Sequence, residues 1–332
     1  MSSSSSSSRP VARLLSVVLP AYREEAGIAR VLTELEQVLA TLDMSFEVIV
    51  VDDGSPDRTF QQVSELCAAR PWLRGLRLSR NFGKESALLA GLQAARGDAV
   101  ITLDADLQHP PALIPELVAA WRQGAMVVNG VKADRSVENQ GYASLATLIT
   151  EGLGRLTGIS LRDASDYKLL DRQVVDILTY SLAERQRFFR GLSQWVGFRQ
   201  VDVPFKVAPS TRRTRNWSFG SLLRLTGTAL VSFTSAPLQV ITVLGVLTLL
   251  MAVLVGGEAL VSRMAGRAVS GFTTLILTLL IIGSFIMISL GILGAYVAKI
   301  YEEIKGRPSY LVAERCGATG PGGGHRYRRV RR

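Results

Sequence analysis

Cysteine and histidine are both rare in this sequence of 332 residues. The two cysteines are Cys67 and Cys316, and the two histidines are His109 and His325. A disulfide-stabilised scaffold or a zinc site built on paired cysteines needs more cysteines than this, and a histidine-rich metal site needs more histidines. Thiols used this sparingly are typical of a catalytic part that faces the reducing cytosol.

Charged residues are also few. They make up 20% of the sequence against 48% hydrophobic residues, and the mean hydropathy is +0.24. This balance excludes a disordered or collagen-like chain and indicates membrane segments. The net charge is +10, but nine basic and three acidic residues fall within 299–332 alone. The excess charge therefore indicates a cytoplasmic membrane flank rather than a basic stripe that binds nucleic acid.

Two long segments lack charge altogether. Residues 225–257 and 271–298 contain no Asp, Glu, Lys or Arg, and each is longer than the about 20 residues that cross a bilayer. Since the start of the first segment is mixed and carries Pro237, we place the two spans at about 237–257 and 272–297. The alternative is a pair of helices buried in a soluble core, but such helices seldom stay uncharged over this length.

Two spans return the chain to the side on which it starts. Basic residues follow the second span, which predicts a multi-pass plasma-membrane protein with both termini cytoplasmic and 258–270 as a short outer loop. The predicted parts are a disordered Ser-rich tail at 1–13, a cytosolic catalytic domain at 14–212, a juxtamembrane basic and amphipathic segment at 213–236, the two spans within 237–298, and a basic cytoplasmic tail at 299–332. The juxtamembrane segment is predicted to be an interfacial helix or, alternatively, a connector packed on the catalytic domain.

Residues 14–132 alternate between strand-like and helix-like patterns. Five short buried strands are predicted at Leu15–Leu19, Phe46–Val51, Leu73–Leu78, Ala99–Leu103 and Met126–Val131. Between the first two, apolar residues recur in steps of three and four from Ile28 to Leu42, which predicts an amphipathic helix. This alternation is typical of an α/β fold with a mostly parallel, Rossmann-like sheet covered by helices on both faces.

Polar clusters follow the predicted strands, where such sheets bind ligands. Asp104 and Asp106 come directly after a strand, and two carboxylates so placed can converge on Mg²⁺ or Mn²⁺; the alternative is a solvated acidic turn. Asp52 and Asp53, in VVDDGS, are candidates to accept hydrogen bonds from a nucleotide base or ribose. The structural alternative is an Asx turn or the N-cap of the next helix. Lys84, in NFGK, is a candidate ligand of a diphosphate.

Together these segments resemble family-2 glycosyltransferases with a GT-A fold. PAYREE, VVDDGSPD, RNFGKESALLAGLQAARGD and DADLQHPP occur in the order and spacing of that family. Further along, DASDYKLLDR, QRFFRGLSQWVGFRQ and SFTSAPL are similar to the polyprenyl-phosphate branch, which includes dolichol-phosphate mannosyltransferases and bacterial GtrB-like undecaprenyl-phosphate glucosyltransferases. Two C-terminal spans are typical of the bacterial members, and the resemblance covers roughly residues 14–310.

The resemblance also implies roles for individual residues. It assigns the nucleotide base and ribose to Pro20, Tyr22, Glu24, Asp52 and Asp53, the metal and through it the diphosphate to Asp104, Asp106 and Gln108, and the acceptor phosphate to Lys132, Arg135, Arg213 and Arg215. The segment TRRTRNWSF, which carries the last two arginines, departs from the Gly-Glu-Ser-Lys type of sequence common in the family.

The expected activity is that of an inverting, metal-dependent hexosyltransferase. It would move a sugar, with UDP-glucose favoured and GDP-mannose as the alternative, onto undecaprenyl phosphate for cell-envelope glycans. We expect Asp106, Arg135 and Asp166 to act in catalysis, Asp166 either as a base or as a cap or partner of Lys168 or an arginine. A polysaccharide synthase would need more spans, and an inactive nucleotide-binding anchor would not need complete metal motifs. Bacterial relatives imply a homo-oligomer.

Overall fold

The computed structural model describes residues 14–106, 109–132, 166–182, 189–205, 236–266 and 271–317. These residues belong to two compact units. The first unit contains the described residues up to 205 and those from Pro308 onward, and the second contains the long helices of 236–307. The predicted Ser-rich tail and nearly all of the predicted juxtamembrane segment lie outside the described residues.

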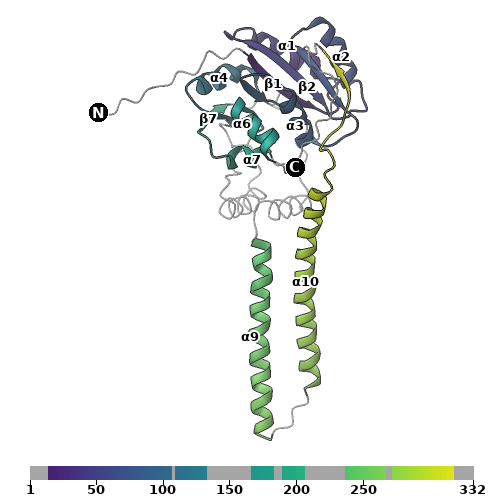
Figure 1. Ribbon diagram of the computed structural model, residues 1–332, viewed down its shortest axis with the longest axis vertical. Helices are drawn as coiled ribbons and strands as arrows, with labels where there is room; N and C mark the ends of the chain where they lie inside the picture. The colour runs from purple at the N-terminus through teal and green to yellow at the C-terminus, as the bar shows by residue number, and fades with distance from the viewer. Residues whose placement is uncertain are drawn as a thin grey trace, which may run out of the picture. The chain divides into compact units, whose positions relative to one another are not determined.

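The first unit is built on one eight-stranded sheet with the strand order β7-β5-β6-β4-β1-β2-β3-β8; Figure 1 labels β1, β2 and β7 of this sheet. Its strands are β1 Leu14–Ala21, β2 Ser45–Asp52, β3 Leu73–Leu78, β4 Ala99–Thr102, β5 Val127–Lys132, β6 Lys168–Asp171, β7 Gln200–Phe205 and β8 Val312–Cys316. Strand β1 pairs in parallel with β2 and β4, β2 pairs in parallel with β3, and β5 with β7. Strands β6 and β8 run antiparallel to their neighbours. The predicted α/β class and all five predicted strands are confirmed.

Helices cover both faces of this sheet. They are α1 Ile28–Leu39, α2 Thr59–Ala69, α3 Lys84–Ala94, α4 Ile114–Arg122, α6 Arg172–Asp176 and α7 Phe189–Trp195, with the short 3₁₀ helix η1 Pro111–Leu113 and the short π-helix η2 Ile177–Ser181. Along β1, Leu15, Val17 and Leu19 point into a core shared with α1, α2 and α4. The intervening Val18 faces α3, where Gly91 lies against it. Alternate residues of one strand thus anchor the two helical layers.

The second unit consists of α9, Ala236–Met264, and α10, Phe272–Ile304, which lie side by side in Figure 1. Their stretches Leu238–Ser262 and Leu275–Ile304 are long and apolar enough to cross a membrane, and none of the apolar window in either is buried by protein. A helix of a soluble core would be covered by other side chains. The two helices therefore coincide with the two predicted spans.

The C-terminal region holds a strand that the sequence reading did not predict. Strand β8 lies inside the range 299–332, which the sequence predicts to be a basic tail, and it extends the sheet next to β3. The pattern VAERC has two charged residues in the middle of a short segment, and most of its positions are exposed. An exposed edge strand of this kind has neither an apolar run nor a clear alternation of apolar and polar residues, so its sequence does not predict a strand.

Gly91→Ala is expected to destabilise the first unit. A Cβ atom at this position would lie 2.2 Å from Cγ1 of Val18 and 3.2 Å from Cγ2 of Val51. Overpacking of this kind costs about 1–3 kcal/mol, which outweighs the roughly 1 kcal/mol that Ala gains over Gly inside a helix. The melting temperature of the detergent-purified protein should fall by a few degrees.

The matched control is Gly291→Ala, also inside a helix, where the added Cβ meets nothing within 4 Å. This variant should melt at or above the wild-type temperature. A Gly91→Ala protein that melts as high as the control would contradict the close packing of α3 on β1.

Candidate functional site

The predicted ligand-binding segments meet at one edge of the sheet. Because β1, β2 and β4 are parallel neighbours, the residues that follow Ala21, Asp52 and Thr102 emerge on the same side. The amide of Asp53 donates to the carbonyl of Ala21 at 2.9 Å, and the amide of Leu103 donates to the carbonyl of Val18 at 3.1 Å. The sheet therefore brings PAYREE, DDGS and DAD together, as the sequence predicts.

Side-chain hydroxyls join the first two of these loops. Oγ of Ser55 accepts from the amide of Arg23, and Oγ1 of Thr59 accepts from the amide of Glu24, both at 2.9 Å. Arg23 has φ of 59°, a backbone conformation that costs free energy for a residue with a side chain. Gly54 has φ of 66°, and a Cβ there would lie 2.4 Å from the backbone of Arg80. These contacts hold the two loops in one fixed arrangement.

The two acidic residues of DDGS are buried and act on different partners. Oδ1 of Asp52 accepts from the amide of Ser55 at 3.1 Å, a local hydrogen bond that spans three residues within its own loop. The carboxylate of Asp53 accepts from the amides of Phe82 and Gly83 at 2.7 and 2.9 Å, and so fixes the loop before α3. Burial raises the pKa of both carboxyl groups, and these hydrogen bonds oppose that rise.

An ion cluster lies beside this edge. Nζ of Lys84, at the start of α3, is 2.6 Å from Oδ1 of Asp104 and 2.5 Å from Oδ2 of Asp166. Arg190, on α7, binds Asp166 through Nε at 2.7 Å and Nη2 at 2.8 Å. The arrangement gathers two cations and two carboxylates from four different parts of the chain.

The cluster sets the charge state of its members. Burial disfavours the charged forms of Lys84 and Asp166, but their ion pairs outweigh burial in both cases. The carboxylates of Asp104 and Asp166 raise the pKa of Lys84 above its usual value. The hydrogen bonds from Arg190 and the charge of Lys84 hold the pKa of Asp166 well below its usual range. Lys84, Asp166 and Arg190 are therefore ionised near neutral pH.

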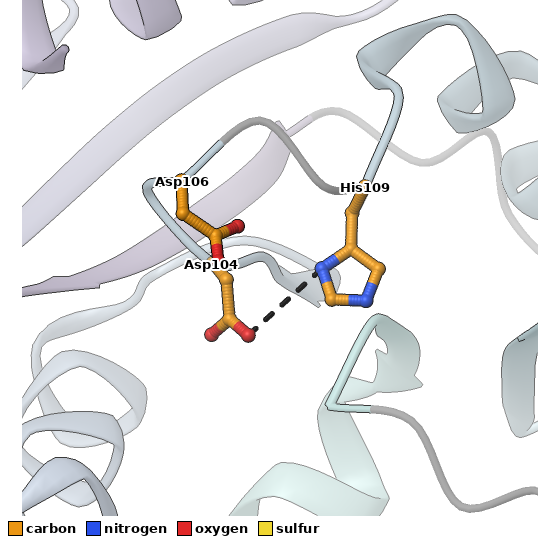
Figure 2. Close-up of side chains that lie close together, drawn as sticks. All are labelled: Asp104, Asp106 and His109. Atoms are coloured by element: carbon orange, nitrogen blue, oxygen red, sulfur yellow. Dashed lines mark ion pairs between the residues drawn. The ribbon is translucent and has the colours of Figure 1, made fainter. Parts of the chain in front are cut away.

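Three side chains in this region could hold a metal ion. The ligand atoms of Asp104, Asp106 and His109 lie within 4.8 Å of one another. Figure 2 shows Nδ1 of His109 pointing toward the carboxylate of Asp104, at 3.9 Å from Oδ2. The imidazole is buried against the rings of Tyr167 and Phe205, which fix its plane. Two carboxylates and one imidazole suit Mn²⁺, and the carboxylates also suit Mg²⁺ with substrate phosphates.

The structure brings together most of the predicted site residues. Tyr22 is 39% exposed beside the DDGS loop, and Lys132 is the last residue of β5, which runs parallel to β4 across β6. The predicted residues Gln108, Arg135, Arg213 and Arg215 lie outside the described residues. For Asp166, the contacts favour the predicted alternative of a partner for an arginine, here Arg190, and its low pKa disfavours the role of a base.

Sequence reasoning did not single out three residues of this region. His109 lies within DADLQHPP and Arg190 within QRFFRGLSQWVGFRQ, and neither pattern gives these two residues a role of their own. Glu85 follows Lys84, and its carboxylate accepts from the amide of Phe189 at 3.0 Å. Burial raises the pKa of Glu85 to about 7. Only the approach of α7 to α3 in the folded chain reveals the partners of Glu85 and Arg190.

Comparison with known proteins gives consistent matches. The sequence profile of glycosyl transferase family 2 matches residues 16–177. An uncharacterized glycosyltransferase of Synechocystis sp. is 37% identical over 91% of this chain and 96% of its own length. The putative glycosyltransferase CsbB of Bacillus subtilis is 34% identical over 91% and 92%, and the bactoprenol glucosyl transferase of Shigella phage SfII is 31% identical over 90% and 97%.

Solved structures also overlap part of the chain, and one of them illustrates the coverage. The glucosyl-3-phosphoglycerate synthase of Mycobacterium tuberculosis aligns with 66% of this chain and 79% of its own, with a TM-score of 0.44 and 22% identity. An overlap of this quality adds nothing to the fold assignment, which rests on the strand order and the sheet pairing described above.

Glu85→Gln is expected to flatten the pH dependence of stability. Because the folded-state pKa is about 7, against 4.5 for an ordinary glutamate, the folded protein binds more protons between these pH values than the unfolded chain does. Wild-type stability therefore falls as pH rises through this window, by on the order of 3 kcal/mol. Glutamine keeps the acceptor for Phe189 and carries no charge.

The measurement is the melting temperature of wild type and variant between pH 5 and pH 8.5. The variant should melt higher than wild type at the alkaline end, and the two should converge near the acidic end. Parallel curves across the whole range would show that Glu85 does not titrate in this window.

Proposed function

Because the chain belongs to glycosyltransferase family 2, we propose that it transfers a sugar from a nucleotide-diphosphate sugar to a polyprenyl phosphate at the cytoplasmic face of a membrane. The observation that carries this proposal is the meeting of Asp104, Asp106 and Lys84 beside the DDGS loop, in a chain that also has two apolar helices. Relatives named bactoprenol glucosyl transferase match 90% of the chain, so the likeness includes these helices.

In this proposal the nucleotide sugar binds at the sheet edge formed by the loops after β1, β2 and β4. We assign the nucleotide base and ribose to Pro20, Tyr22, Glu24, Asp52 and Asp53. Asp104 and Asp106, with Gln108 or His109, would hold Mg²⁺ or Mn²⁺, and the bound ion would neutralise charge on the departing diphosphate. The ammonium of Lys84 is fixed 2.6 Å from Asp104 and can contact the same diphosphate. UDP-glucose is the proposed donor and GDP-mannose the alternative.

The acceptor is already a nucleophile. A phosphate monoester carries roughly 1.5 to 2 negative charges near neutral pH, so its oxygen can attack the anomeric carbon with little help from a base. Asp166 is ionised but both of its oxygens are occupied by Arg190 and Lys84. We therefore assign Asp166 to positioning these two cations. Displacement by the acceptor oxygen would invert the anomeric centre.

Binding of the acceptor phosphate is assigned to Lys132, Arg135, Arg213 and Arg215. Lys132 ends a strand that points toward the same sheet edge as β4. Guanidinium groups bind phosphate through paired hydrogen bonds, which fits a lipid head group that must be oriented at the membrane surface. The excess of basic residues after the second span supports an orientation with both termini in the cytoplasm.

A transfer assay tests the proposal directly. Purified protein is incubated with undecaprenyl phosphate, Mg²⁺ or Mn²⁺, and radiolabelled UDP-glucose, GDP-mannose or other nucleotide sugars. We expect label in the lipid fraction with UDP-glucose, and loss of transfer when EDTA removes the metal. Label from GDP-mannose alone would select the alternative donor, and no lipid-linked product from any nucleotide sugar would overturn the proposal.

Asp104→Asn and Asp106→Asn should each lower kcat by at least about a hundredfold, because each removes a carboxylate charge from the proposed metal site. Asp106→Asn should keep the wild-type melting temperature, whereas Asp104→Asn should still fold but also weakens the ion pair with Lys84. Asp43→Asn, at an exposed position, is the matched control and should keep wild-type activity. A metal-dependent wild type with a fully active Asp106→Asn variant would exclude this metal site.

Arg135→Ala and Arg215→Ala should affect the acceptor rather than the donor. A charge-assisted hydrogen bond to phosphate contributes about 1.5–3 kcal/mol, so kcat/KM for undecaprenyl phosphate should fall about ten- to a hundredfold. The KM for the nucleotide sugar should change little. Arg30→Ala, which removes an exposed arginine paired with Glu34, is the control. A raised donor KM with normal acceptor kinetics would place these arginines on the other substrate.

A further inference from the structure

Strand β8 is held to the first unit along its whole length. It begins at Val312, eight positions after the end of α10 at Ile304, and pairs antiparallel with β3. The amide of Ser79 donates to the carbonyl of Leu311 at 2.9 Å. At the other end, the sulfur atoms of Cys67 and Cys316 are 2.8 Å apart, and both cysteines are free thiols.

One ion pair links β8 to the DDGS loop. Glu314 lies opposite Arg77 in the sheet, and Oε1 of Glu314 accepts from Nη1 of Arg77 at 2.7 Å. The same guanidinium donates from Nη2 to the carbonyl of Ser55 at 3.4 Å, and its Nε is 3.5 Å from Oδ2 of Asp52. Arg77 thus contacts β8 on one side and the predicted nucleotide loop on the other.

The buried carboxylate of Asp52 lies beside the guanidinium of Arg77. The Asp52 side chain is 0% exposed, and its Oδ2 makes no hydrogen bond with any described residue. A buried carboxylate without a nearby cation is costly to keep ionised. Burial raises the pKa of Asp52, and the hydrogen bonds with Ser55 and then the charge of Arg77 oppose that rise. The position of Arg77 therefore influences both the charge of Asp52 and the carbonyl of Ser55.

We propose that Arg77 and Glu314 are positioning residues of the donor site, and that Glu314 holds Arg77 against Asp52 and Ser55. The strand that follows the second membrane helix thereby sets the affinity of the protein for the nucleotide. This inference rests on the proposed function, because it takes the DDGS loop as part of the donor site. A simpler role for β8 is to cover the edge of β3, and the test must separate the two.

The measurement is binding of UDP and of GDP, each with Mn²⁺, to the full-length protein by titration calorimetry. Glu314→Ala should weaken binding about threefold, as expected for loss of a partly exposed ion pair. Arg77→Ala should weaken it about tenfold, and Arg77→Lys should fall between, because an ammonium cannot make all three contacts. In steady-state assays the donor KM should rise while kcat and the acceptor KM stay near wild type.

Arg315→Ala is the matched control, because it removes an exposed charge at the neighbouring position of β8. It should bind nucleotide as the wild type does. If all β8 substitutions act by loosening the strand, this control and Glu314→Ala should show similar losses of melting temperature and of active enzyme, with unchanged donor KM. That pattern would overturn the proposal.

The paired thiols provide a sharper separation. Oxidised glutathione can convert the Cys67 and Cys316 thiols to a disulfide, and it is itself reduced to two glutathione thiols as the two protein S–H bonds are lost and one S–S bond forms. The product is verified by intact mass. This bond keeps β8 attached to α2 whatever residue stands at position 314. The binding measurement is then repeated on the oxidised Glu314→Ala and Arg77→Ala proteins.

Under the proposal, both variants keep their binding defects after oxidation, because Arg77 still lacks a contact or is absent. Recovery of wild-type nucleotide affinity in oxidised Glu314→Ala would show that the strand only covers the edge of β3. A reduced Glu314→Ala protein that binds nucleotide as tightly as the wild type would show the same. If the wild type binds neither UDP nor GDP, the donor-site assignment itself fails, and the inference fails with it. Wild-type binding with an unaffected Glu314→Ala variant overturns the inference alone.

Discussion

Parallel pairing of β4, β1 and β2 is the constraint on which the site depends. Three strands that run in the same direction must release their following loops at one edge, and each of these loops carries the polar residues of a different motif. Alternation along β1 fills both sides of the sheet with apolar side chains, so helices pack on both faces. The loops can then be held by only a few hydrogen bonds, since the strands beneath them are already fixed.

Charge balance is the second organising feature. Asp104, Asp106 and Asp166 would repel one another if they stood alone, and Lys84 and Arg190 offset part of that repulsion. Both oxygens of Asp166 contact these cations. Asp106 and His109 instead lie beside Asp104, as Figure 2 shows. The cluster thus has one part that is closed by internal ion pairs and another that offers ligand atoms to a cation. In the proposed function, both parts act on the diphosphate of the donor.

Sequence patterns predicted the features that depend on local residues. Four of the five predicted strands are mainly apolar runs, β3 keeps buried leucines between its arginines, and α1 has a regular apolar stripe. Strands β6, β7 and β8 were not predicted, because KLLD, QVDVPF and VAERC are short and each contains a charged residue. The contacts of Arg190 with Asp166 and of Glu85 with Phe189 join residues 24 and 104 positions apart, so no local pattern reports them. The arginines assigned to the acceptor remain predictions.

The distance along the chain between β3 and β8 has a consequence for biosynthesis. Arg77 and Glu314 are 237 positions apart, and both membrane helices lie between them. A ribosome that makes the chain from the N-terminus completes β3 long before β8, so one backbone edge of β3 stays unpaired while both apolar helices are synthesised. The eight-stranded sheet can therefore be completed only after the second of these helices has been made.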